Sequence, residues 1–296
     1  MTKPNSSYDI KNILCRTFDS KRKRMFSSLR TNCLLFLHDK KTAWSLKVKS
    51  KNKMKETRLF YTPDIEVSNE LPLEEAQHIV KVLRLKEDDI ILLTDGKGYL
   101  YEARITLATT RHCSVELLKK ESITKPWPNK IHIAVAPTKN MDRNEWMVEK
   151  TTEIGVDHIT FLDCDFSERH QVKTDRIEKI AVAAMKQSHK MWKPQIDEIT
   201  KFKDFIAKPW TGQKFIAHCY SASDFPDYPS EKPLLQNALQ KGTDALVCIG
   251  PEGDFSIDEV KQAMNRGFIP ISLGSSRLRT ETAAIIATHL LQLFSH

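Results

Sequence analysis

The chain has 296 residues, of which 40% are hydrophobic and 28% are charged, so it is long enough for about two folded domains. No apolar run approaches the ~18 residues of a membrane-spanning helix, which excludes an integral membrane protein of helical type. The net charge of +8 comes from residues 1–55, which hold 15 basic and three acidic residues, while the rest of the chain is mildly acidic. RNA binding by the folded body would therefore require local basic patches.

Residues 1–55 form a basic leader without a sustained helical or strand period. A basic, acid-poor start that contains serine is typical of a transit peptide. We prefer the simpler interpretations, a disordered tail or translation assigned upstream of a start at Met54. We expect the leader to be disordered and to lie outside the fold.

Cysteine and histidine spacing indicates neither a disulfide framework nor a metal centre. The six cysteines include no CxxC pair, and the ten histidines form no HExxH motif. We therefore expect a reducing, cytoplasmic location and no bound metal.

The first folded segment, residues 56–122, reads as a small β-barrel with one helix. Apolar residues three and four apart predict a helix in LPLEEAQHIVKVLRLK (71–86). Three β-like runs follow at 89–95, 99–108 and 113–120, and the glycine pair in GKG (96–98) predicts a hairpin turn between the first two. Two prolines around Trp127 predict an extended linker over 121–130.

From residue 123 onward, strands and helices alternate. Apolar runs predict strands at 130–137, 157–163, 213–219, 245–250 and 268–274, and helical patterns lie between them or after them at 142–155, 174–188, 256–267 and 280–294. Asp142 is the expected N-cap of the first helix, Gly155 its stop, and Ser256 with Glu259 a capping box. This alternation predicts an α/β fold whose parallel sheet is covered on both faces.

Three loops follow predicted strands at the sheet edge where α/β proteins bind ligands: AHCYSAS (217–223), IGPEGDFS (249–256) and LGSSRLRTET (273–282). Neither a GxGxxG nor a P-loop motif occurs there, and IGPEGDFS alone fits an ordinary tight turn equally well. Thr280 as a cap and Glu281 in the first turn suit a helix start, but Arg277 and Arg279 oppose the helix dipole. Their presence indicates an anionic group nearby.

These motifs, together with NEWMVEKTTEIGV and SERH, resemble the RsmE family of SPOUT-class methyltransferases, which methylate N3 of a uridine in small-subunit ribosomal RNA. RLFYTPDI, HIVKVLRL and GKGYLYEARI are similar to that family's PUA-like barrel. The resemblance covers about residues 57–294 and implies three parts, namely the leader (1–55), a PUA-like RNA-binding barrel (56–122) and a SPOUT domain (123–296) with a parallel sheet and a C-terminal trefoil knot.

The resemblance also implies that the knotted loops bind S-adenosylmethionine. The positions that match the cofactor-contacting motif are His218, Ile249, Gly250, Pro251, Glu252, Gly253, Leu273, Gly274, Ser276, Leu278, Thr280 and Thr282. Two departures stand out. Asp254 occupies the place of the last glycine of the family's GPEGG, and serines 275 and 276 stand where the family often has proline and another residue.

Methylation of uracil N3 requires loss of the imide proton, which leaves negative charge on O2 and O4. We expect Arg279, or Arg277, to stabilise that anion, and Glu281 either to accept the proton or to organise the cofactor loop. The target base must be unpaired or extruded, so the barrel is expected to hold neighbouring RNA. The RNA-binding candidates are Arg58, His78, Lys81, Arg84, Lys139, Arg143 and Arg169.

The last helix is almost uncharged after Glu281, so one side is expected to pack on the sheet and the other to face a second subunit of a homodimer. A fully buried helix in a monomer is the alternative. The expected partner is 16S rRNA or the small ribosomal subunit, with no membrane and no metal. A non-catalytic RNA-binding adaptor, and a SPOUT methyltransferase acting on another RNA position, are the alternative functions.

Overall fold

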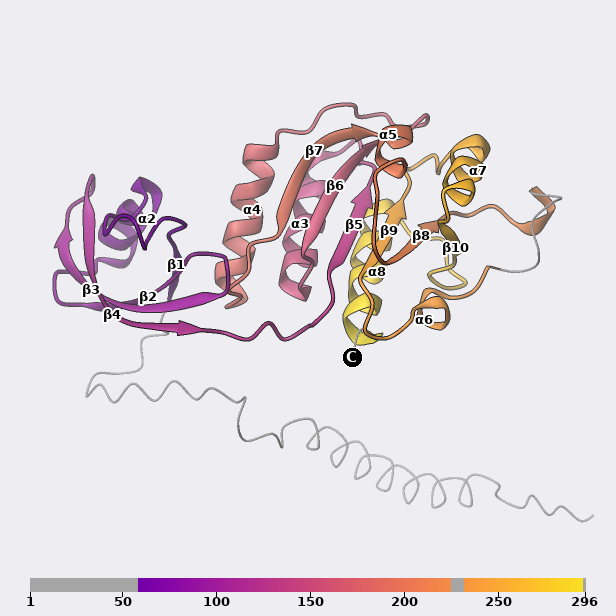
Figure 1. Ribbon diagram of the computed structural model, residues 1–296. Helices are drawn as coiled ribbons and strands as arrows, with labels where there is room; N and C mark the ends of the chain where they lie inside the picture. The colour runs from indigo at the N-terminus through magenta and orange to yellow at the C-terminus, as the bar shows by residue number, and fades with distance from the viewer. Residues whose placement is uncertain (1–57, 225–231, 295–296) are drawn as a thin grey trace, which may run out of the picture. The chain divides into compact units, whose positions relative to one another are not determined.

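The computed structural model describes residues 58–224 and 232–294, and the predicted leader lies outside the described residues. Residues 56–296 form one compact unit (Figure 1). None of the helices in its described part is both long and apolar enough to cross a membrane.

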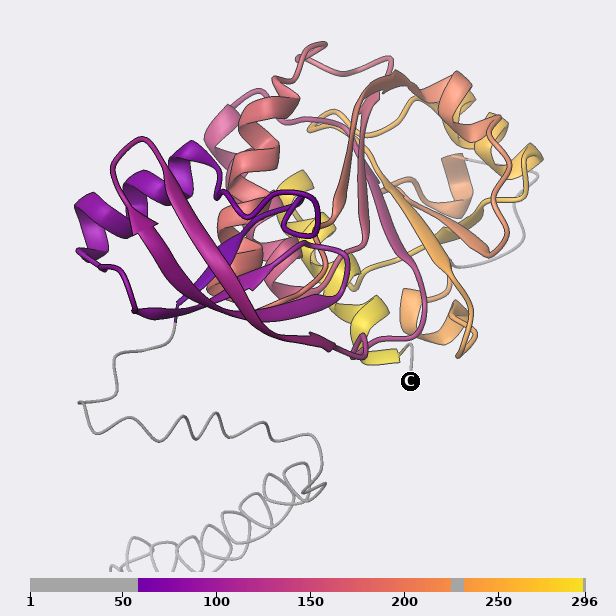
Figure 2. The same ribbon diagram turned by 60° about the vertical axis from the view of Figure 1, so that its left-hand side comes forward.

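The N-terminal sheet contains four strands in the order β1 (Leu59–Tyr61), β2 (Ile90–Thr94), β3 (Tyr99–Ala108) and β4 (Cys113–Ser122). The predicted hairpin is confirmed, since Gly96 and Gly98 between β2 and β3 have φ of 73° and 104°. The three predicted runs pair antiparallel, β2 with β3 and β3 with β4, whereas β1 runs parallel to β2. Two register shifts between β3 and β4 bend this long pair (Figure 2).

The predicted helix of this region begins as α2 (Leu73–Gln77) and continues as a π-helix over His78–Leu83. Arg84 ends it in a left-handed conformation with φ of 55°. Ala76 and Ile79 are buried against Phe60 and Tyr101 of the sheet, so the apolar face that predicted the helix is the face that packs.

The second sheet has six strands, all paired in parallel, as the alternation of strands and helices predicts. Its order is β10 (Ile269–Ile271), β8 (Gln213–Ala217), β9 (Ala245–Ile249), β5 (Ile131–Val135), β6 (His158–Asp163) and β7 (Gln195–Lys201). Strand β7 and the short α5 (Phe202–Ile206) were not predicted. Charged residues interrupt the apolar pattern of β7, as expected for a sheet edge.

Helices cover both faces of this sheet (Figure 1), which confirms the predicted layers. Helices α3 (Met141–Ile154), α4 (Thr174–Gln187) and α8 (Thr280–Phe294) contribute buried side chains to one face. Helices α5 and α7 (Ile257–Asn265) contribute to the other. Two shorter elements, a 3-10 turn (Ala222–Asp224) and α6 (Leu235–Ala238), lie between β8 and β9 in the chain.

Two of the three predicted helix signals are confirmed. Ser256 and Glu259 form the reciprocal capping box of α7, and Gly155 ends α3 with φ of 120°. Asp142 is not the N-cap of α3. The side chain of Asn140 caps the helix by accepting a hydrogen bond from the Asp142 amide, so the cap lies two residues earlier than predicted.

The strand order places the topological switch between β5 and β9. From β5 the chain proceeds outward through β6 to β7, and then returns to build β8, β9 and β10 on the opposite side. In open parallel sheets such a reversal opens a crevice at the carboxyl ends of the strands. The trefoil knot and the domain boundaries implied by the resemblance stay predictions.

Candidate active site

A pocket of about 790 Å³ lies at the carboxyl ends of β8, β9 and β10. Ala217, Ile249 and Ile271, the last residues of these three strands, all line it. The loops that follow the strands supply most of the remaining wall, and Arg143 of α3 contributes from the side. The pocket therefore lies at the carboxyl edge of the sheet where α/β proteins bind ligands, on the β8–β10 side of the switch between β5 and β9.

The structure brings most of the predicted cofactor positions together in this pocket. His218, Ile249, Gly250, Pro251, Glu252, Leu273, Gly274, Ser276, Leu278 and Thr280 line it, as do Arg277 and Arg279. Gly253, Glu281 and Thr282 belong to the same loops but do not line it. Gly274 has φ of 133°, and a side chain built there would meet no atom within 4 Å, so the backbone is open to a ligand.

The loop after β9 holds the neighbouring loops through side-chain hydrogen bonds. The Thr280 hydroxyl donates to the carbonyl oxygen of Gly250 at 3.0 Å, and Thr280 is the first residue of α8, not its predicted cap. The Lys139 amide donates to Oε1 of Glu252, also at 3.0 Å. The pocket walls are thus joined to one another without a ligand.

Asp254 makes the third of these links and accounts for the departure from glycine at this position. Its φ of 69° is left-handed, a conformation that favours glycine. Its Oδ2 accepts a hydrogen bond of 2.7 Å from the Cys219 amide, and its Oδ1 accepts one of 2.8 Å from the Phe255 amide. These two bonds stabilise the strained backbone and tie the loop after β8 to the loop after β9.

Arg277 and Arg279 are exposed at the mouth of the pocket. No ion pair joins either guanidinium to a carboxylate among residues 58–224 and 232–294. Arginines that line a pocket without a protein counter-charge are suited to bind an anionic or partly anionic group.

Glu281 is buried behind the pocket wall, with 7% of its side chain exposed. Its Oε1 lies 3.8 Å from Nε of Arg143, and its Oε2 is buried without a hydrogen-bond partner among the described residues. Arg143 was predicted to contact RNA, but it both lines the pocket and faces this carboxylate.

Two further polar groups lie on the β8 side of the pocket. Burial, followed by the charge of Lys232, lowers the pKa of His218 to about 4, so its imidazole is neutral near pH 7. Lys232 itself lines the pocket and was not among the predicted residues. It belongs to no recognisable motif. The only feature of the sequence that could have indicated it is its position between two of the three loops expected to bind a ligand.

The predicted RNA-binding residues differ in exposure and in the partners that they bind within the protein. Arg58, Lys81 and Arg84 are exposed, whereas the half-buried His78 packs edge-on against Phe60 and has a pKa lowered by burial. Lys139 pairs with Glu168 at 2.7 Å. The Arg169 guanidinium donates to the carbonyl oxygens of Thr138 and Lys139, so it serves the loop structure.

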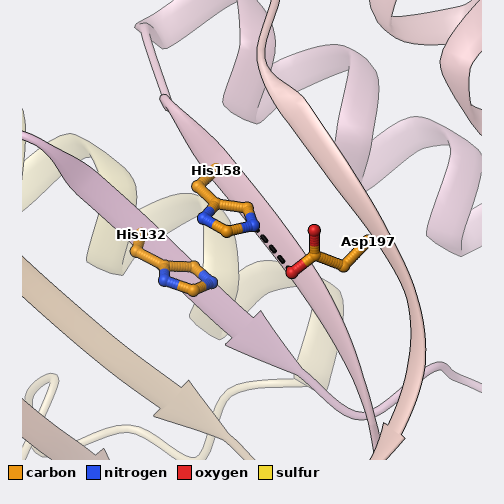
Figure 3. A group of neighbouring side chains, drawn as sticks. All are labelled: His132, His158 and Asp197. Atoms are coloured by element: carbon orange, nitrogen blue, oxygen red, sulfur yellow. Dashed lines mark hydrogen bonds and ion pairs between the residues drawn. The ribbon is translucent and has the colours of Figure 1, made fainter. Parts of the chain in front are cut away.

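A buried polar cluster lies on strands β5, β6 and β7 (Figure 3). The His158 ring lies 2.7 Å from Oδ2 of Asp197, and the Thr160 hydroxyl donates to the same oxygen. Nε2 of His132 lies 2.9 Å from the Thr160 hydroxyl oxygen, which fixes that nitrogen as the donor.

Although these side chains are of metal-ligating types, their arrangement favours a hydrogen-bonded chain. The rings of His132 and His158 stack with centroids 3.8 Å apart and an interplanar angle of 8°. The nitrogen lone pairs lie in the planes of the two stacked rings, and these nearly parallel planes do not meet, so the lone pairs do not converge on one ion at ~2.0–2.1 Å. Burial lowers the pKa of both imidazoles, that of His132 to about 3.

Comparison with known families gives matches over both parts of the chain. Residues 125–292 match the family described as RNA methyltransferase domain, and residues 71–118 match the RNA methyltransferase PUA domain. Ribosomal RNA small subunit methyltransferase E of Bacillus subtilis is 26% identical over 220 residues, which cover 72% of this chain and 85% of that protein.

Solved structures agree. A probable rRNA-methyltransferase from Porphyromonas gingivalis is 42% identical with a TM-score of 0.74, over 80% of this chain and 98% of that one. Ribosomal RNA small subunit methyltransferase E from Neisseria gonorrhoeae, solved bound to S-adenosyl methionine, is 26% identical with a TM-score of 0.66, over 80% of this chain and 97% of that one.

Proposed function

The chain belongs to the RsmE family of RNA methyltransferases, and we propose that it methylates small-subunit ribosomal RNA with S-adenosylmethionine, at N3 of a specific uridine. The observation that carries this proposal is the pocket at the ends of β8, β9 and β10, with Arg277 and Arg279 at its mouth and neither paired to a carboxylate within residues 58–224 and 232–294. The N3 position rests on the family resemblance together with those arginines.

The pocket fits the cofactor in size and in the character of its wall. Its volume of about 790 Å³ lies within the ~300–1,000 Å³ usual for ligand sites. Apolar strand ends contribute to its wall, Gly274 leaves backbone open to a flat base, and polar and charged side chains of the loops line much of the rest. When bound, S-adenosylmethionine supplies an electrophilic methyl group on a sulfonium, a chemistry that needs no metal.

The arginines at the mouth suit the charge that develops on uracil. Removal of the N3 proton spreads negative charge onto O2 and O4, and a guanidinium fork binds such an oxygen without needing to reorganise. We assign this role to Arg279, with Arg277 as the alternative, because both line the pocket and neither has a counter-charge in the described part of the chain.

Glu281 is proposed to organise the cofactor loop. It does not line the pocket, and its carboxylate faces Arg143 inside the wall, which supports this role over direct proton acceptance. Arg143 is accordingly proposed to hold the Glu281 carboxylate in place, in addition to any contact with RNA.

Three exposed cations at the N-terminal sheet and its helix are proposed to hold RNA beside the target nucleotide. N3 lies on the Watson–Crick edge, so the uridine must leave its pair to react, and phosphate contacts by Arg58, Lys81 and Arg84 would fix the flanking strand. We propose 16S rRNA, or the small subunit that contains it, as the substrate, and the cytoplasm as the place of action.

A homodimer formed through α8 and α3 is proposed as the assembly. Leu293 on α8 is 56% exposed and Trp146 on α3 is 45% exposed, although these two helices pack against each other and their inner sides are buried. Such apolar exposure fits a face that a second copy covers.

The proposal is tested by incubating the purified protein with small subunits, or with 16S rRNA, and methyl-labelled S-adenosylmethionine. Digestion to nucleosides and mass spectrometry should yield labelled 3-methyluridine at one position. Label on another base or another atom would contradict the N3 assignment alone. Cofactor binding without any transfer to either RNA form would favour the RNA-binding adaptor.

A further inference from the structure

Lys232 projects a half-buried ammonium group into the β8 side of the pocket. Its Nζ donates hydrogen bonds to the carbonyl oxygens of His218 and Tyr220, the latter at 2.7 Å. It also lies 3.4 Å from Nδ1 of His218, a distance at which a hydrogen bond is weak. Two of its three N–H groups are thus well used, and the third is poorly satisfied.

The charge of this ammonium group is not balanced by a bonded carboxylate. Among residues 58–224 and 232–294, no Asp or Glu forms an ion pair with Nζ, and carbonyl oxygens do not neutralise a positive charge. Burial lowers the pKa of Lys232, and the nearby Cys219, Asp254 and Asp224 oppose this effect only through space, without a bond to Nζ. A half-buried cation on a pocket wall is most stable when a ligand supplies the negative charge.

We propose that Lys232 binds the α-carboxylate of the methionine part of S-adenosylmethionine. The inference rests on the proposed function, since it takes that cofactor to be the ligand of this pocket, and it adds a recognition group that lies outside the sequence motifs. The two backbone carbonyls fix the position of Nζ, so a carboxylate gains a charge-assisted hydrogen bond with little ordering cost.

A phosphate of the RNA substrate is the other source of negative charge. The observations favour the cofactor, because the ammonium is half-buried within the pocket, whereas Arg277 and Arg279 are exposed at its mouth. A small carboxylate reaches inside such a pocket, while a polymer phosphate is more easily met by the exposed arginines.

The experiment compares two ligands that differ only in the carboxylate. Isothermal titration calorimetry measures binding of S-adenosylmethionine and of decarboxylated S-adenosylmethionine to the wild-type protein, Lys232→Gln and Lys232→Met. Glutamine keeps N–H donors for the two carbonyls but removes the charge, and methionine removes both. We expect Lys232→Gln to weaken S-adenosylmethionine roughly tenfold or more, and to change the decarboxylated ligand less than twofold.

Lys214→Gln is the matched control. Its Nζ, like that of Lys232, donates to a backbone carbonyl, that of Arg266, but it does not line the pocket. We expect this variant to bind both ligands as the wild type does, so a loss confined to Lys232 reports the pocket and not the general cost of removing a lysine.

Other outcomes overturn the inference in recognisable ways. Equal weakening of both ligands by Lys232→Gln would mean that Lys232 only holds the His218 loop. Unchanged binding of both ligands, with weaker RNA binding, would assign the ammonium to a phosphate. If the wild-type protein binds neither ligand, the proposed function itself fails.

Discussion

The Asp254 carboxylate accepts a hydrogen bond of 2.7 Å from the Cys219 amide, and this bond joins the loops that follow β8 and β9. Both residues line the pocket, so the contact shapes the proposed cofactor site before any ligand arrives. Asp254 holds a left-handed φ of 69° to make it. Asp254, which stands where the family has glycine, therefore links the two loops through its side chain.

Substitutions at Asp254 should separate the effect of losing this hydrogen bond from the effect of the strained backbone. Asparagine tolerates the left-handed region and keeps an acceptor oxygen, so we expect Asp254→Asn to bind S-adenosylmethionine nearly as the wild type does. Asp254→Ala loses the link and keeps the strain, and should lower the free energy of unfolding by about 1–3 kcal/mol. Asp254→Ala should also bind S-adenosylmethionine more weakly, because the link shapes the pocket. Asp254→Gly should regain part of the lost stability, since glycine relieves the strain, but should bind the cofactor as weakly as Asp254→Ala does. Urea unfolding and calorimetry check both, and equal cofactor affinity in all three variants would contradict a role in shaping the pocket.

Loss of the catalytic arginine should reduce turnover far more than cofactor affinity. We expect Arg279→Ala or Arg277→Ala to lower kcat by about 10²–10³-fold, as for removal of one donor to a developing anion. Binding of S-adenosylmethionine should change only a few-fold. Arg266→Ala, an exposed arginine away from the pocket, is the control. Near-normal turnover of both pocket variants would rule out the electrostatic role.

Glu281 offers a test between its two candidate roles. An isosteric Glu281→Gln should retain turnover within about tenfold if the side chain only organises the loop, whereas loss of a general base typically costs about 10²–10⁴-fold. Because Glu281 lies behind the pocket wall facing Arg143, we expect the smaller effect. Glu281→Ala should be worse than Glu281→Gln, since it leaves the arginine without a polar partner. Single-turnover rates at saturating cofactor decide the question.

Arg84 should contribute to RNA affinity alone. Its side chain is exposed and its backbone has a left-handed conformation. Asparagine tolerates that conformation, so Arg84→Asn removes the charge without straining the backbone. We expect weaker RNA binding, a salt dependence reduced by about one ion, and unchanged cofactor binding. Arg104→Ala is the control, because Arg104 lies on β3 in the same N-terminal region but pairs with Glu116 at 3.0 Å. Loss of cofactor binding by Arg84→Asn would indicate damage to folding instead.

The sequence predicted the pocket well because its loops carry distinctive residues directly after apolar strands. Which loops touch one another depends on the strand order, and local periodicity carries little information on that order. The bond from Asp254 to Cys219 therefore required the structure, as did the place of Lys232. Strand β7 was missed because an edge strand has a mixed pattern, and the turn at Arg84 because one left-handed residue has no periodic signal.

The buried histidines also escaped sequence reasoning, since a single polar residue inside an apolar strand leaves the strand pattern unchanged. In the structure, His132 and His158 stack on neighbouring strands (Figure 3). The chain of hydrogen bonds from His132 through Thr160 ends at Asp197. Burial tends to raise the pKa of Asp197, but hydrogen bonds from Thr160 and Gln195 lower it overall, so the carboxylate stays ionised.

This cluster should make the protein sensitive to mild acid. Burial lowers the pKa of His132 from 6.5 to about 3, so below pH 6.5 the unfolded chain takes up a proton that the folded protein does not. Stability is therefore lost as the pH falls from 6.5 towards 3, and His132 alone should remove about 1.5–2 kcal/mol between pH 6.5 and 5. His158, whose pKa is also lowered, should add to this loss.

Urea unfolding at pH 7.5, 6.5 and 5 checks the prediction, with His132→Phe as the diagnostic variant. Phenylalanine keeps a stacked ring but cannot titrate, so its stability should depend less on pH than that of the wild type. His112→Phe is the control, because His112 is exposed and pairs with Glu70 at the surface. A wild-type protein equally stable at pH 6.5 and 5, or a variant with an unchanged pH slope, would contradict the assignment. Added zinc should not raise the Tm, since the stacked rings do not converge on one ion.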